Sequence, residues 1–162
     1  MVRSGLFDVS ALYDALDAQR RSRDLSWSAV ARAIGGISVS TLTGLPGRTV
    51  VEGDGVLQML RWLDRAPESF VRGSPAGSEV RLPSVGPDEV LRFDAAAIYD
   101  ALDAQRVPRD WTWQQLADAI GGVSASMLTR LAQGGRVSVP PIIRIVSWLG
   151  RPVAEFTRAS KH

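Results

Sequence analysis

The chain has 162 residues, of which 45% are hydrophobic and 22% charged, and its net charge is only +2. This composition is typical of a folded protein with one domain or two small ones. No apolar run approaches the roughly 18 residues that a membrane span needs, and the N-terminus lacks the apolar stretch of a signal peptide. Cysteine is missing, which excludes disulfides and thiolate metal sites. We therefore expect a cytoplasmic protein with no membrane partner.

The basic residues are unusual in kind, because eighteen are Arg and one is Lys. Codon usage in a GC-rich genome would produce this preference without any function. Arg also binds phosphates and base edges with two parallel hydrogen bonds, which suits nucleic acid. The nearly balanced total charge favours the first explanation.

The sequence repeats itself at an offset of 86 residues. LYDALDAQR at 12–20 returns as IYDALDAQR at 98–106, and about 30 of the 66 positions from 7 to 72 are identical in the second copy. Two copies of this length are too long and too few for a solenoid. The repeat predicts two tandem domains of one fold, and Gly, Pro and Ser mark a linker between them. The predicted boundaries are 1–72 for the first domain, 73–89 for the linker and 90–162 for the second domain. Within the linker, EVRL at 79–82 could pair as a short strand.

A first helix is predicted near the start of each copy. Apolar residues at i, i+3, i+4 and i+7 form one helix face, namely Val9, Leu12, Tyr13 and Leu16, and Asp8 stands where an N-cap is expected. The same helix carries acids three residues apart, which could be proposed as catalytic carboxylates. Such pairs on a polar helix face are more typical of a solvated surface, and we assign them no catalytic role: Asp14 and Asp17, Asp100 and Asp103.

Two further short helices follow in each copy. The second begins at Ser26 or Thr112, where T-W-Q-Q fits a capping box, and it ends at a Gly-Gly pair. The third begins at once, with Ser38 or Ser124 as its N-cap. Two helices joined by a tight glycine turn form a helix-turn-helix. A fourth helix and a last turn complete each copy, so the sequence predicts an all-α fold with about five helices in each domain.

The second copy carries apolar and small residues in a distinctive order, with glycine at the turn and serine opening the third helix: Leu116, Ala117, Gly121, Ser124, Leu128, Leu131 and Gly134. In these positions, and in its ending LGRPVAEF, it resembles the lambda-repressor-like (Cro/repressor type) helix-turn-helix family. The first copy matches more loosely, through Val30, Ala31, Gly35, Ser38, Leu42 and Leu45. The resemblance covers nearly the whole chain outside the linker. It implies a sequence-specific protein that binds double-stranded DNA with its third helices in the major groove, most simply a transcription regulator.

Carried over position by position, the resemblance implies two groups of DNA contacts. Base edges would meet Ala125, Ser126, Thr129 and Arg130 in the second copy, and Val39, Ser40 and Thr43 in the first. Phosphates would meet Arg48, Arg136, Ser38 and Ser124. Arg23 and Arg109 are further phosphate candidates, because arginines cluster where the first helix ends, although a solvated surface is the default reading there. Arg130 is the strongest single candidate, because guanine O6 and N7 together accept a bidentate guanidinium.

The chain departs from the family at three points. Trp27 and Trp113 occupy positions where members often carry a DNA-contacting Gln, and their helical spacing with other apolar residues predicts core packing. A second glycine lengthens the turn, which would alter the angle of the third helix. Gly44 stands in the first copy where the second has Arg130.

Other classes of function are weighed on the same residues. The balanced charge and Gly44 favour an alternative, a protein-interaction module built on degenerate helix-turn-helix domains. A homodimer or another protein partner stays open, although a covalent tandem can supply both halves of a DNA site from one chain. No phosphate loop, metal-ligand spacing or catalytic triad is present, and His162 is the only histidine. We therefore expect no enzyme activity, no metal and no cofactor.

Overall fold

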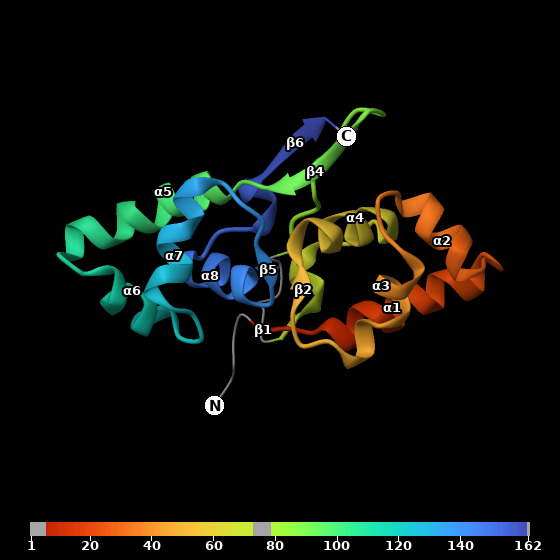
Figure 1. Ribbon diagram of the computed structural model, residues 1–162, viewed down its shortest axis with the longest axis horizontal. Helices are drawn as coiled ribbons and strands as arrows, with labels where there is room; N and C mark the ends of the chain where they lie inside the picture. Colours follow the sequence, from red (N-terminus) through yellow and green to blue (C-terminus); the bar gives the residue numbers. More distant parts are fainter. Residues whose placement is uncertain (1–5, 73–78, 162) are drawn as a thin grey trace.

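The computed structural model describes residues 6–72 and 79–161. Residues 73–78 of the predicted linker, and the two chain ends at 1–5 and 162, lie outside the described residues. Two helical lobes lie at opposite ends of the molecule, and short strands lie between them (Figure 1). We refer to residues 6–72 as unit one and to residues 79–161 as unit two.

Both units follow the same order of elements. Unit one contains β1 (Leu6–Phe7), α1 (Val9–Ser22), α2 (Trp27–Ile34), α3 (Val39–Thr43), η1 (Leu45–Gly47), β2 (Val51–Glu52), α4 (Gly53–Leu63), η2 (Pro67–Phe70) and β3 (Val71–Arg72). Unit two contains β4 (Glu89–Phe93), α5 (Ala95–Arg106), η3 (Val107–Arg109), α6 (Trp113–Ile120), α7 (Ala125–Arg130), η4 (Leu131–Gln133), β5 (Ser138–Val139), α8 (Pro141–Leu149), η5 (Val153–Phe156) and β6 (Thr157–Lys161). The elements labelled η are short 3₁₀ helices.

The predicted helix starts are confirmed. Each N-cap side chain accepts a hydrogen bond from a backbone N–H three residues later, which satisfies one of the free donors of the first turn; the caps are Asp8, Ser26, Ser38, Asp94, Thr112 and Ser124. Thr112 and Gln115 form the predicted capping box. The apolar faces of α1 and α5 are buried, so periodicity and capping identified these helices correctly.

The prediction of an all-α fold is wrong, because the described residues also form three two-stranded antiparallel sheets. The chain is therefore mixed α and β, and the predicted fifth helix of each domain is a 3₁₀ turn. Strands of two residues are too short to show an alternating pattern, and TRASK at 157–161 has no apolar alternation to reveal β6. The stretch 79–82 forms no strand.

Two of the sheets are the same feature in the two units. β1 pairs with β3 at Phe7 and Val71, and β4 pairs with β6 at the equivalent Phe93 and Thr157. Each sheet joins the start of a unit to its end. The third sheet pairs β2 of unit one with β5 of unit two, and the buried apolar residues of both units form one continuous cluster. The described part of the predicted linker lies against unit one, where Arg81 pairs with Asp64 at 2.7 Å.

The repeated LDAQR segment shapes the turn between the first two helices. Arg20 donates from Nη2 to Asp17 Oδ1 (2.7 Å) and from Nη1 to the carbonyl of Leu25 (3.1 Å), and its guanidinium lies over the ring of Trp27. Arg106 makes the same three contacts in unit two, with Asp103, Trp111 and Trp113. The repeated sequence is therefore explained by a repeated set of contacts around Arg20 and Arg106, which we call the arginine clamp.

Two sequence predictions concern residues at or beside this clamp, namely the packing of the Trp rings and the exposure of the acids in the first helix. Trp27 stacks on Tyr13 at 5.5 Å, and Trp113 on Tyr99 at 5.0 Å, so both Trp rings pack against the core as predicted. Asp14 and Asp100 are exposed, in line with a solvated face. Asp17 and Asp103 differ, because the arginine clamp holds both of them in ion pairs.

Candidate nucleic-acid interface

The turn before the third helix depends on both glycines of each pair. Gly35 and Gly36 have φ values of 83° and 71°, and Gly121 and Gly122 have 79° and 74°. L-residues rarely adopt this region, because Cβ then meets the backbone. The extra glycine of the sequence is thus a second left-handed residue, and it sets the direction in which α3 and α7 leave the turn.

In unit two, α7 buries one face and presents the other to solvent. Ser124 caps the helix by accepting from the Met127 N–H at 3.1 Å, and Leu128 is fully buried against the core. Ser126, Thr129 and Arg130 are exposed, and Ala125 is half-buried. The helix therefore offers hydroxyl and guanidinium groups on a surface that is free to meet a ligand.

Four of the predicted contact residues line one open cavity of about 360 Å³: Ser124, Ser126, Arg130 and Arg136. Its apolar side is formed by residues such as Ile142 and Ile145 of α8. No hydrogen bond or ion pair within the described residues engages the guanidinium of Arg130 or Arg136. Two guanidiniums without a carboxylate partner at one cavity suit a phosphate or another anion.

Sequence reasoning missed other residues of this cavity. Met127 and Gln133 also line it, and Gln133 lies three residues beyond the last residue of the predicted contact face. Ile142 and Ile145 are core residues, 2% and 1% exposed, that also reach the wall of the cavity. The polar Gln133 beside Arg130 was the one signal available.

In unit one, α3 repeats this arrangement with a less polar surface. Ser38 caps the helix through the Thr41 N–H at 3.2 Å, and Leu42 is fully buried. Ser40 and Thr43 are exposed, and 38% of Val39 is accessible. Arg48 is exposed beyond the helix end, so the face offers hydroxyls and methyl groups with a single guanidinium nearby.

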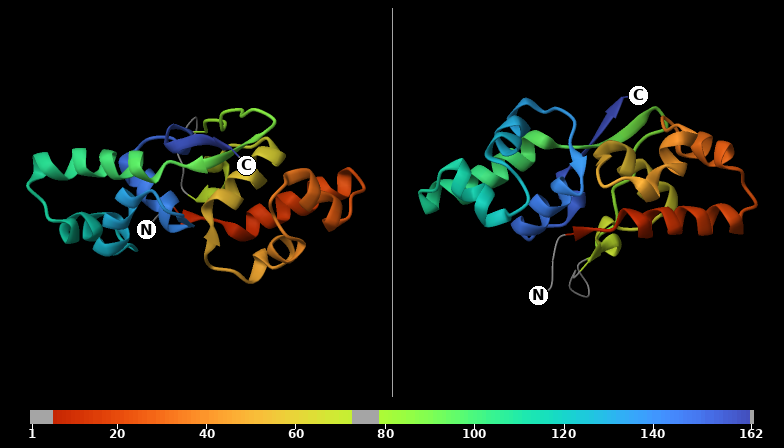
Figure 2. Two further views of the ribbon diagram at one scale, coloured as in Figure 1. Left: turned by 45° about the horizontal axis from the view of Figure 1, so that its top comes forward. Right: turned by 60° about the horizontal axis from the view of Figure 1, so that its bottom comes forward.

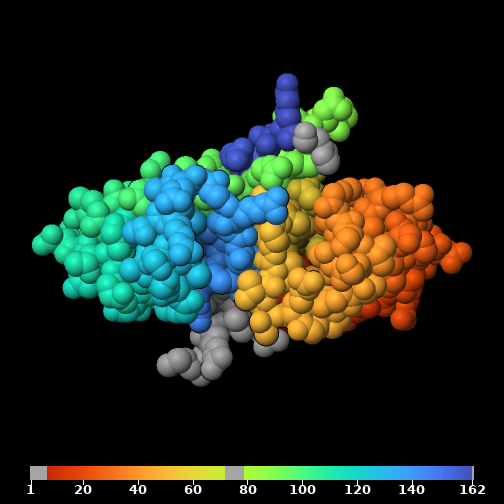
Figure 3. All heavy atoms as spheres, viewed as in Figure 1, coloured from red at the N-terminus to blue at the C-terminus, as the bar shows by residue number. Residues whose placement is uncertain are grey.

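Both third helices are reached from the same side of the molecule. Figure 3 shows the segment around α3, in orange, and the segment around α7, in blue, facing the viewer together. The strands β2 and β5 lie between them (Figure 1). One flat ligand could therefore meet both helices at once.

The last two predicted phosphate contacts lie elsewhere. Arg23 stacks over Trp62 at 5.3 Å, and Arg109 stacks over Trp111 and Trp148 at 5.2 and 5.7 Å. They follow α1 and α5, whose C-terminal ends lie at the two outer ends of the molecule (Figure 1). The structure thus gives both arginines a packing role and does not bring them together with the residues of the α7 cavity.

Searches against protein-family models, curated proteins and solved structures find no match to the chain. Among the described residues, no helix has the length and apolar character to cross a membrane. The described residues also contain no group of three or more His, Cys, Asp or Glu side chains that could hold a metal ion. The candidate interface therefore rests on its own geometry.

Proposed function

We propose that the protein binds double-stranded DNA sequence-specifically, with α7 and α3 in the major groove, and acts as a transcription regulator. One observation carries the proposal. Two equivalent third helices, each following a turn with two left-handed glycines, lie on one side of the molecule, and each exposes hydroxyl side chains. A helix-turn-helix meets DNA with the exposed face of its second helix.

Arg130 is the proposed base-reading residue. Its guanidinium is exposed and has no ion-pair partner among the described residues, and guanine offers two acceptors at the matching spacing. Ser126 and Thr129 supply hydroxyls that can donate to phosphate oxygens and can donate to or accept from base edges. Arg136 and Arg48, beyond the helix ends, are proposed to hold phosphates, which would position the units without selecting sequence.

The small net charge of +2 limits the non-specific attraction to DNA. Affinity that comes from counterion release grows with the number of phosphates neutralised, and few unpaired guanidiniums face the proposed site. The proposal therefore assigns most of the affinity to specific contacts. It also keeps the cytoplasmic location expected from the sequence.

Selection from random duplex DNA with the full chain tests this proposal, followed by gel shifts at a stated salt concentration. Arg130→Ala is expected to relax the preference at one base position and to weaken binding by about 1–3 kcal/mol. Arg158→Ala is the matched control, because Arg158 is also exposed but lies on β6. Absence of retardation at micromolar protein, or a selected motif that Arg130→Ala leaves unchanged, would contradict the proposal or its site.

A protein-interaction role is the second candidate, and it is favoured by the surface of unit one. Val39 and Val50 are 38% and 51% exposed there, and Gly44 stands in place of an arginine. Apolar side chains near a helix face suit a protein partner better than a phosphate backbone. If the selection returned no motif, this candidate would replace the first.

A further inference from the structure

The ladder between β2 and β5 has a reciprocal register. Glu52 pairs with Ser138, which is its own equivalent at the offset of 86 residues. Val51 pairs with Val139, the equivalent of Gly53. In return, the Gly53 N–H donates to the carbonyl of Val137, the equivalent of Val51, at 2.7 Å. An interface in which position i meets j and j meets i is the mark of a two-fold axis.

Contacts elsewhere between the units obey the same reciprocity. The fourth helix of unit one, α4, packs on β4 at the start of unit two, and the fourth helix of unit two, α8, packs on β1 at the start of unit one. The turns η2 and η5, which are equivalent, also meet, where Glu68 Oε2 accepts from the Val153 N–H at 3.0 Å. Figures 1 and 2 show the two helical lobes on either side of this shared middle. The two units are therefore related by a pseudo-two-fold axis that passes between β2 and β5.

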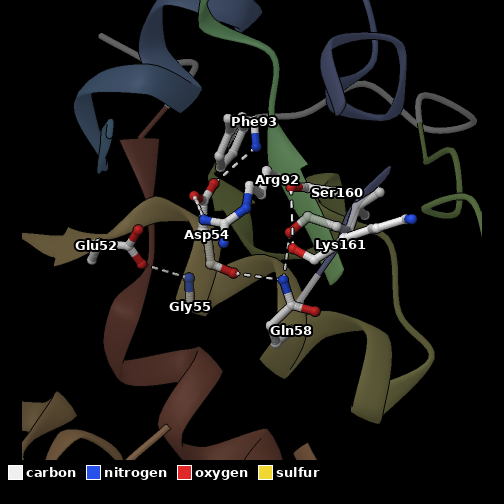
Figure 4. A network of polar contacts seen from close by, with 9 residues as sticks. Glu52, Asp54, Gly55, Gln58, Arg92, Phe93, Ser160 and Lys161 are labelled. Carbon is white, nitrogen blue, oxygen red and sulfur yellow. Dashed lines mark hydrogen bonds and ion pairs between the residues drawn. The ribbon is translucent and has the colours of Figure 1, made fainter. Parts of the chain in front are cut away.

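Polar contacts make the junction rigid (Figure 4). Asp54, in the first turn of α4, accepts from the Phe93 N–H at 2.9 Å and from Arg92 Nη1 at 3.2 Å. Gln58 is buried, and its amide donates to the carbonyls of Asp54 and Leu91. Buried polar groups with complete hydrogen bonding specify one arrangement, so the units do not act as beads on a flexible tether.

We infer that a single copy of this chain binds an inverted arrangement of two half-sites with unlike sequences. The inference rests on the proposed DNA binding and adds the symmetry, the stoichiometry and the asymmetry of the target. B-DNA has two-fold axes perpendicular to its helix axis, so units related by a two-fold face half-sites of opposite direction. Tandem domains on a flexible linker would have no such preference and could bind direct repeats equally well.

The two half-sites are expected to differ in sequence because the exposed faces of α3 and α7 carry different residues. Unit two offers Arg130 where unit one offers Gly44, so only the second half-site is expected to require a guanine at that position. Because the halves differ, a motif selected by the wild-type chain would not show the inverted symmetry by itself. The test must therefore make the two faces alike.

Three substitutions give α3 the contact sequence of α7: Val39→Ala, Thr41→Met and Gly44→Arg. The triple variant of the full chain is expected to select a palindrome from random duplex DNA, with half-sites separated by about one helical turn. Native mass spectrometry should show one chain per duplex. Inserting about half a turn between the half-sites should weaken binding about 100-fold, because the second contact is lost.

Three results would overturn the inference alone: a direct repeat selected by the triple variant, two chains on each duplex, or affinity that is insensitive to the insertion. A chain that selects no motif, as wild type or as variant, would overturn the proposed function and the inference with it. The two failures are therefore distinguishable. A thermal melt checks that the triple variant folds, since an added Cβ at Gly44 would lie 2.9 Å from the carbonyl of Ser40.

A second measurement keeps the wild-type contact faces. The chain has no cysteine, so Ala33→Cys and Ala119→Cys each provide one attachment point for a DNA-cleaving probe. Ala33 and Ala119 are exposed and occupy equivalent positions on α2 and α6. If the units are inverted, the probe at Ala33→Cys should cleave one strand at its half-site, and the probe at Ala119→Cys should give the corresponding pattern on the opposite strand at the other half-site. Identical strand patterns from both probes would contradict the inference even if the triple variant failed to fold.

Discussion

The third helices of the two units share their framework and differ in what they expose. Both begin with a capping serine, bury one leucine completely and follow two left-handed glycines. Their outer faces diverge, since Gly44 follows the last residue of α3 at the position where Arg130 ends α7. The open cavity with two unpaired guanidiniums belongs to unit two. The capping serine, the buried leucine and the two glycines therefore fix each helix, whereas the outward residues can differ without affecting it.

The units differ even more at their junction. Between residues 46–61 and 132–147, only Val51 and Val137 are identical. Asp54 and Gln58 bind the backbone of β4 from unit one, whereas Pro140 and Arg144 stand at the equivalent positions in unit two. The two-fold relation is thus kept by backbone pairing while its side chains have become specialised.

The largest expected effect comes from breaking the junction at Gly53. A Cβ added there would lie 2.9 Å from the carbonyl of Val137 and 3.0 Å from the ring of Phe93. Gly53→Ala should therefore lower the free energy of unfolding by about 2–3 kcal/mol, measured by urea denaturation. Gly47→Ala is the control, because nothing lies within 4 Å of its added Cβ. Equal stabilities would show that the units do not depend on this approach.

Alanine substitutions in the turn before each third helix test whether this turn is equally strained in both units. Gly35→Ala and Gly121→Ala each force an L-residue into a positive φ, at 83° and 79°. Each is expected to cost about 2 kcal/mol, by thermal or urea unfolding. Gly135→Ala, whose added Cβ meets open space without a positive φ, should change little. A large difference between the two variants would mean that one turn relaxes.

The arginine clamp should behave alike in the two units. Arg20→Lys and Arg106→Lys keep the charge but lose the planar fork that reaches Asp and carbonyl together, so each should cost about 1–2 kcal/mol of unfolding free energy. Arg81→Ala removes only an exposed ion pair, with Asp64, and should cost less than about 0.5 kcal/mol. A clamp variant that cost no more than Arg81→Ala would show that the clamp does not stabilise the fold.

The smallest effect concerns the arginines beyond the third helices. If Arg136 and Arg48 each hold one phosphate, Arg136→Ala and Arg48→Ala should each reduce the slope of log K against log salt by about 0.9. Gel shifts across a salt series measure this slope, and Arg158→Ala should leave it unchanged. A change for Arg136 alone would confine the phosphate contact to unit two.

Helices and caps could be read from the sequence, because spacing and cap chemistry are local. The strands could not, since β2 and β5 exist only where distant segments meet. The same limit applies to the candidate site. The resemblance placed Ser126, Thr129 and Arg130 on an exposed helix face, and they are exposed. Arg23 and Arg109, which were assigned to phosphates, stack instead on tryptophan rings away from α7. Pairings across the molecule depend on tertiary contacts that no single segment encodes.

The two-fold relation inside one chain has a consequence for evolution. In a regulator built from two identical subunits, every substitution appears twice, so both halves of the target must change together. Here Gly44 and Arg130 are encoded by separate codons, although they occupy equivalent places. If α3 and α7 bind DNA as proposed, one half of the contact surface can change while the other stays constant, and a new target can be reached in single steps.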